Sequence, residues 1–300
     1  MNQVNHPVII VNPVSGRGLD RSRLQNVERL ARKMGWDGEI LETTSQMHAG
    51  FLAQKAVHSG ARHIIICGGD GSVMEALEAV AGTKCALGIV PLGTGNLFAV
   101  NLDLPRTING ALKVALFGVV RDIDIGLTNG VYFGILTGIG WDAAMVRDAN
   151  RELKDRLGLL AYFLAAIRNL EHPISRYEIT IDGQPSLTVS AKSIIVANMG
   201  LIPGRIEAIP KAHPDSGELT IAIVQAESLF SWVALSASAL TGRLVDDSRL
   251  QLFSGKHIVI QSLDGPQLVE ADGNDQPSTE RLTVQVVPGG ASIYMPDKRR

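Results

Sequence analysis

The sequence contains very little cysteine. Its 300 residues include only two, Cys67 and Cys85, and they do not form a CxxC pair. Both lie next to apolar runs that are typical of buried strands. We therefore expect reduced thiols in the core of a cytoplasmic protein, which argues against a disulfide framework and against a zinc site.

Aromatic residues and net charge are also scarce. Aromatics make up 5% of the chain and the formal net charge is −2, so the sequence offers neither stacking platforms nor a positive field for nucleic acid. No apolar run approaches the length that spans a bilayer, and Met1–His6 lack the apolar core of a signal peptide. We expect no nucleic-acid partner and no transmembrane segment, with any membrane contact peripheral.

One stretch, Ile64–Gly71, combines an apolar run with a glycine turn and reads Ile-Ile-Ile-Cys-Gly-Gly-Asp-Gly. Four apolar residues without alternation predict a strand buried on both faces of a parallel sheet. Ser72 is predicted to cap a following helix. Such a strand-to-helix turn is where open α/β sheets bind anions. Asp70 would hold magnesium, order water or accept a proton there, although it also suits a simple helix cap.

Two more glycine turns follow short apolar runs, at Asn12–Gly18 and Pro91–Ala99. Neither turn matches the GxxxxGK[ST] phosphate loop or a full GxGxxG motif. Alternating strands and helices place all three turns at the same edge of a parallel sheet. Together they predict a ligand that carries phosphate.

The pattern changes after Asp124, where short β-type runs dominate. We predict an α/β domain with a parallel sheet over residues 1–125 and a β-rich sandwich over residues 126–300, with the final segment packing back on the first domain. Two helical stretches, 157–170 and 229–244, interrupt the second half. The binding site is expected in a cleft between the halves.

The three turns together resemble the catalytic domain of the diacylglycerol kinase and sphingosine kinase family, of the soluble bacterial lipid kinase type. The resemblance implies an α/β first domain of the NAD kinase and diacylglycerol kinase-like type, followed by a β-rich sandwich domain. The resemblance implies ATP and Mg²⁺ as cofactors and a nucleotide site that includes Asn12, Pro13, Ser15, Gly16, Thr43, Gly68, Gly69, Asp70, Gly71, Ser72, Gly93, Thr94 and Asn96. Asp70 is also implied to be catalytic, and the implied metal ligands are Asp70, Asp124 and Asp215.

The chain departs from the family at two places. The family carries Asp-Gly-Glu late in the second domain, and its glutamate is taken as the base for the lipid hydroxyl; here Asn274 stands in its place, and an amide is no base. The catalytic candidates of this stretch are Asp272 and Asp275, with Glu270 as a further carboxylate. The family also has two aspartates before Gly217, the second of which helps to hold a structural magnesium, and Ser216 replaces that second one.

The predicted activity is transfer of the γ-phosphoryl group of ATP to the hydroxyl of a diacylglycerol-like lipid at a membrane surface. Two alternatives remain: a kinase of a soluble substrate that resembles NAD kinase, and a nucleotide-binding regulatory protein with weak catalysis. Apolar stretches 159–170 and 229–240 would either contact the membrane or cover the second sheet. Exposed sheet edges would also suit a homodimer.

Overall fold

The computed structural model describes residues 7–15, 21–140, 143, 174–202, 205–225 and 250–297. The chain divides into two compact units, one formed by residues 1–123 together with 289–300 and the other by residues 124–288. The predicted helices at 157–170 and 229–244 lie outside the described residues. Within the described part of the chain, no helix is long and apolar enough to cross a bilayer.

The first unit is built on a parallel sheet with the strand order β2-β1-β3-β4. The last residues of β18 extend it, because Ser292 and Ile293 pair in parallel with β4. The elements of this unit are β1 (Val8–Val11), α1 (Arg21–Lys33), β2 (Ile40–Glu42), α2 (Ala49–His58), β3 (His63–Gly68), α3 (Asp70–Val80), β4 (Ala86–Pro91), α4 (Leu97–Asn101) and α5 (Ile108–Phe117).

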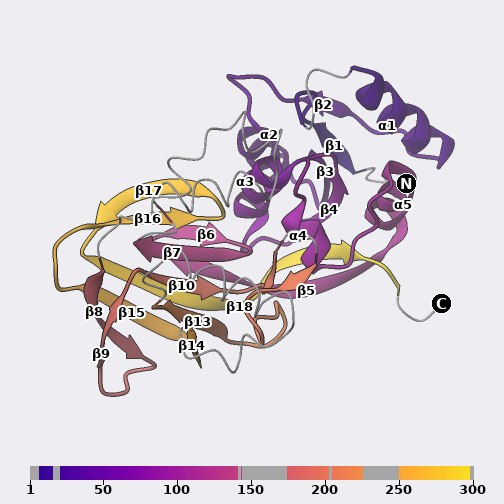
Figure 1. Cartoon of the computed structure of the whole chain (residues 1–300). Helices are drawn as coiled ribbons and strands as arrows, with labels where there is room; N and C mark the ends of the chain where they lie inside the picture. Colours follow the sequence, from indigo (N-terminus) through magenta and orange to yellow (C-terminus); the bar gives the residue numbers. More distant parts are fainter. Residues whose placement is uncertain are drawn as a thin grey trace. The chain divides into compact units, whose positions relative to one another are not determined.

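Helices cover both faces of this sheet (Figure 1). α1 and α5 pack on one face through buried residues such as Val27 and Leu112, which join Ile9 and Ile65 of the strands in a single apolar cluster. α2 and α3 contact each other and the strands. Because both faces are buried, β3 and β4 are almost continuously apolar, as their sequences predicted.

The second unit is a sandwich of antiparallel sheets. One sheet has the order β14-β13-β10-β7-β16-β17, and the other contains β18, β15, β8 and β9. The strands are β6 (Val131–Phe133), β7 (Leu136–Gly140), β8 (Ser175–Ile181), β9 (Leu187–Ala191), β10 (Ser193–Ala197), β11 (Leu201–Ile202), β12 (Ile206–Glu207), β13 (Leu219–Val224), β14 (Leu250–Gly255), β15 (His257–Ser262), β16 (Gln267–Ala271), β17 (Asn274–Thr279) and β18 (Arg281–Met295). Its core includes Phe133, Tyr177, Ile194 and Ile260, all fully or almost fully buried.

Two strands belong to both units along the chain. β5 (Val119–Thr128) starts in the first unit and ends in the second. β18 starts in the second unit and ends in the first. The predicted fold class, an α/β domain followed by a β sandwich, is confirmed. The prediction that Ser72 caps a helix is wrong, because α3 already begins at Asp70 and Gly69 is its N-cap.

Candidate functional site

The first and second glycine turns are joined by side-chain hydrogen bonds. The Asn12 amide Nδ2 donates to Ser72 Oγ over 2.8 Å, and the Gly69 N–H donates to Ser15 Oγ over 3.2 Å. These residues are 60 and 54 positions apart, so only the parallel pairing of β1 with β3 brings them together. The polar residues predicted in the two turns therefore lie at one edge of the sheet.

The second and third turns touch through their backbones. A Cβ added to Gly93 would lie 2.6 Å from Gly69 Cα, and the Leu92 N–H donates to the Gly68 carbonyl over 2.8 Å. Asn96 closes the third turn, because its Oδ1 accepts from Gly93 N–H and its Nδ2 donates to the Gly93 carbonyl. Glycine is required at position 93 by this close approach, since any side chain would push the two turns apart.

Asp70 lies where two helices begin. It is the first residue of α3, and its Oδ1 accepts from Phe98 N–H in α4 over 3.2 Å. Burial raises the pKa of Asp70, while backbone N–H groups at the start of α4 act against that shift. The carboxylate thus connects the second and third turns and brings a negative charge beside two helix amino ends, which favour it.

Arg23 of α1 contributes to these turns. Its Nη1 donates to the carbonyls of Ser15 and Leu92, each over 3.1 Å. One guanidinium therefore bridges the first turn and the third. Helical periodicity gave no signal for this contact, because one of its partners is 69 positions away.

The remaining predicted nucleotide residues differ in their surroundings. Thr43 is buried, and its N–H donates to the Val11 carbonyl, which places it beside the first turn. Pro13 is half-buried, whereas Gly71 and Thr94 are exposed. Gly16 lies outside the described residues.

A neighbouring contact joins the start of α2 to the middle of α3. Glu75 Oε2 accepts from Gly50 N–H and lies 3.1 Å from His48 Nδ1. His48 is the N-cap of α2. Neither side chain belongs to a motif that is visible in the sequence.

In the second unit, Asp272 holds a loop. It lies in the two-residue turn between β16 and β17 with φ of 48°. Its oxygens accept the backbone N–H groups of Gly134, Ile135 and Leu136 over 2.6, 2.9 and 3.0 Å. Because three N–H groups donate to this one carboxylate, the side chain fixes the segment between β6 and β7.

The pairing of β16 with β17 fixes the faces of the neighbouring polar residues. Glu270 pairs with Asp275, and Ala271 pairs with Asn274. Directly opposite residues share a face of the ladder, and successive residues alternate between faces. Glu270 and Asp275 therefore lie on one face and Asn274 on the other. Glu270 is buried and its Oε2 accepts from Gly273 N–H, whereas Asn274 and Asp275 are exposed.

The residues suited to a metal do not form a complete cage. Among the described residues, no group of three or more histidine, cysteine, aspartate or glutamate side chains could hold a metal ion. Mg²⁺ usually keeps several waters and binds one or two carboxylates together with substrate phosphates. Asp70, a single carboxylate among glycine turns, fits a metal that arrives with a nucleotide.

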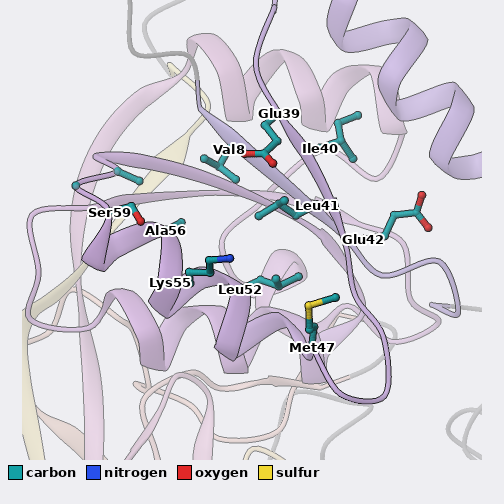
Figure 2. A pocket seen from close by; sticks show the side chains of 12 residues that line it. Val8, Glu39, Ile40, Leu41, Glu42, Met47, Leu52, Lys55, Ala56 and Ser59 are labelled. Atoms are coloured by element: carbon teal, nitrogen blue, oxygen red, sulfur yellow. The ribbon is translucent and has the colours of Figure 1, made fainter.

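The first unit also contains a separate cavity of about 410 Å³ between β2 and α2. Figure 2 shows that Leu52 and Lys55 of α2 lie across this cavity from Leu41 of β2. None of the predicted site residues lines it, although Glu42 and Met47 lie near Thr43 in the sequence.

These features define an α/β domain in which three glycine turns meet at one edge of a parallel sheet, followed by a β sandwich. Residues 6–128 match the model of the diacylglycerol kinase catalytic domain, and residues 136–295 match that of the YegS C-terminal NAD kinase beta sandwich-like domain. The chain belongs to the diacylglycerol kinase family, as its three glycine turns predicted.

Individual relatives agree with this assignment. The chain is 29% identical over 246 residues to a diacylglycerol kinase of Bacillus subtilis, covering 81% of each protein. It superposes with a TM-score of 0.81 and 26% identity on a Bacillus anthracis structure described as a "putative diacylglycerol kinase", covering 98% of both chains. An Archaeoglobus fulgidus NAD kinase in complex with ATP shares the fold, with a TM-score of 0.51 and 11% identity over 98% of this chain and 95% of that one.

Proposed function

We propose that the protein transfers the γ-phosphoryl group of ATP to a hydroxyl group of a diacylglycerol-like lipid at a membrane surface. The observation that carries the proposal is the convergence of three glycine turns. A hydrogen bond from Asn12 to Ser72 and another from Gly69 to Ser15 join the first turn to the second, and the close approach of Gly69 to Gly93 joins the second to the third. The Bacillus subtilis relative, named a diacylglycerol kinase, supports a lipid acceptor.

The turns supply most of what such a transfer requires. Phosphoryl transfer depends on positioning and on electrostatic stabilisation more than on covalent catalysis. We assign the backbone N–H groups of the turns, with the side chains of Ser15 and Ser72, to the phosphates, and Thr43, Thr94 and Asn96 to the edge of the nucleotide site. Mg²⁺ bound with the nucleotide would supply positive charge to the phosphate oxygens. Asp70 is the residue of these turns that would hold it.

In the transfer itself, a bond forms between the lipid oxygen and Pγ while the bond from Pγ to the ADP oxygen breaks. The hydroxyl proton must then leave the lipid oxygen, and water is the acceptor proposed for it here. On the geometry of β16 and β17, Asp275 lies on the opposite face from Asn274, and Asp272 already accepts three N–H groups. We therefore propose that Asp272 is a positioning residue and that Asp275 contributes little as a base.

This arrangement also supports the second candidate, a nucleotide-binding protein with weak catalysis. General-base help is typically worth about 10²–10⁴ in rate. Asn274→Glu is accordingly expected to raise lipid phosphorylation, whereas Asn274→Gln, which adds similar length without a charge, is expected to leave it unchanged. Asp275→Asn should have little effect. A large loss in Asp275→Asn would contradict the strand-face argument.

The decisive experiment follows labelled γ-phosphate from Mg-ATP into a panel of lipids in mixed micelles. Wild type is compared with Asp70→Asn, which keeps an oxygen acceptor for Phe98 N–H but removes the charge. Asp37→Asn, at an exposed carboxylate whose ion pair with Arg32 is on the surface, serves as the control. We expect labelled lipid with wild type and Asp37→Asn and loss of label with Asp70→Asn.

Two other outcomes would replace the proposal. Label that enters a dinucleotide without any lipid present would favour the soluble-substrate alternative. Intact ATP binding without transfer to any acceptor, in wild type and in Asn274→Glu alike, would favour a regulatory protein.

A further inference from the structure

Asp124 is tied into the second unit by hydrogen bonds at its backbone and at its carboxylate. Its N–H donates to the Pro214 carbonyl over 2.6 Å, and its carbonyl accepts from Asn198 Nδ2 over 2.8 Å. Its Oδ2 accepts from Gly217 N–H over 2.7 Å. The side chain is almost fully buried. The segment Pro214–Glu218, here called the Pro214 turn, is thus held against Asp124 at two points.

The Pro214 turn is also closed from within. Ser216 Oγ donates to the Glu218 carbonyl over 2.8 Å and accepts from Glu218 N–H over 3.3 Å. Gly217 adopts a φ of 72°, a conformation that favours glycine. In this conformation its N–H points toward Asp124. The hydroxyl of Ser216 therefore completes a local turn.

This is the place where the family fold implies a structural magnesium, and the residues present do not fit one. Hard cations such as Mg²⁺ and Ca²⁺ require about six to eight oxygen ligands. Here Asp215 is exposed, and the Ser216 hydroxyl is engaged within the turn. Asp124 Oδ2 already accepts the backbone N–H of Gly217. No third acidic side chain completes a cluster among the residues that the structure describes.

We infer that this chain holds the Pro214 turn to Asp124 with its own hydrogen bonds and that no structural metal binds at this turn. Ser216 is the residue that makes the difference. It replaces a charged oxygen ligand with a neutral hydroxyl that the turn itself uses. The stability of this turn should then not depend on Mg²⁺. The inference does not depend on which acceptor the enzyme phosphorylates.

Thermal unfolding of the full chain without nucleotide tests this directly. The midpoint of wild type is measured in EDTA, in millimolar Mg²⁺ and in millimolar Ca²⁺, and the metal content is measured after gel filtration. We expect midpoints that agree within about 1 °C and no retained metal. A bound structural metal would raise the midpoint by about 5–10 °C at roughly 100 times its dissociation constant. Such a rise in wild type would overturn the inference.

Two matched variants identify the residue responsible. Ser216→Asp supplies the missing carboxylate, and we expect its midpoint to rise with Mg²⁺ or Ca²⁺ and to fall in EDTA. Ser216→Asn has nearly the same shape without the charge, and its midpoint should not respond to metal. A Ser216→Asp midpoint that is equally indifferent to metal would refute the role given to Ser216.

Discussion

The contact between the second and third turns can be tested by one added methyl group. In Gly93→Ala, the new Cβ would lie 2.6 Å from Gly69 Cα and 2.9 Å from Asn96 Oδ1. Carbon atoms in good contact are about 3.5–4.0 Å apart, so the turns must separate by about 1 Å. Overpacking of this kind costs about 1–3 kcal/mol. We expect the free energy of unfolding to fall by that amount.

Gly71→Ala is the matched control, because a Cβ at position 71 meets no atom within 4 Å. Gly71 lies in the first turn of α3, where alanine is favoured over glycine by about 0.5–1 kcal/mol. The same substitution, two residues from Gly69 in the chain, should therefore leave stability unchanged or raise it. The two variants should therefore differ in sign, because only the Cβ at position 93 meets neighbouring atoms.

Urea unfolding and ATP titration of both variants provide the two measurements. Gly93→Ala should also bind ATP about tenfold more weakly, because the turns that hold the phosphates no longer converge; this corresponds to about 1.4 kcal/mol. If Gly93→Ala matched wild type in stability within about 0.5 kcal/mol, the close approach of the two turns would be refuted. If its stability fell but ATP binding did not, the turns would be in contact without forming the phosphate site.

Two further predictions concern single buried or half-buried groups. Asp272→Ala should lower the unfolding free energy by about 2–4 kcal/mol in urea, since three N–H groups lose their acceptor, and Asp272→Asn should cost less; equal effects of the two would contradict this role. Burial lowers the pKa of His63 to about 4, and its Nε2 donates to the Ala115 carbonyl. Between about pH 6.5 and pH 4, the unfolded chain binds a proton at His63 that the folded chain does not bind. The free energy of unfolding should therefore fall by up to about 3 kcal/mol as the pH drops over this range. His63→Gln should remove most of that dependence.

Much of the first unit followed from local sequence. The unbroken apolar run that starts at Ile64 predicted a strand buried on both faces, and β3 is that strand. The convergence of the turns was also predictable, since parallel strands bring their carboxyl ends to one edge. The start of α3 was misplaced because Gly69, not Ser72, supplies the non-helical residue before the helix.

Long-range contacts were beyond local patterns. The N–H groups that donate to Asp272 belong to residues that precede it by 136 to 138 positions. Arg23 donates to the Leu92 carbonyl. Neither contact produces a periodic pattern in the sequence. The hairpin of β16 and β17 did have a signal, because Asp272-Gly273 between two extended segments is typical of a two-residue turn. Since side chains alternate along a strand, such a turn is enough to place Asn274 and Asp275 on opposite faces.

The course of β18 has a consequence for how the chain is made. Residues 1–123 cannot complete their sheet until Ser292 and Ile293 pair with β4. Translation at about 5–20 residues per second puts roughly 10–30 s between the synthesis of these two segments. During that interval the edge of β4 that will receive β18 is open. The sheet of the first unit is therefore completed only after residues 124–288 have been synthesised.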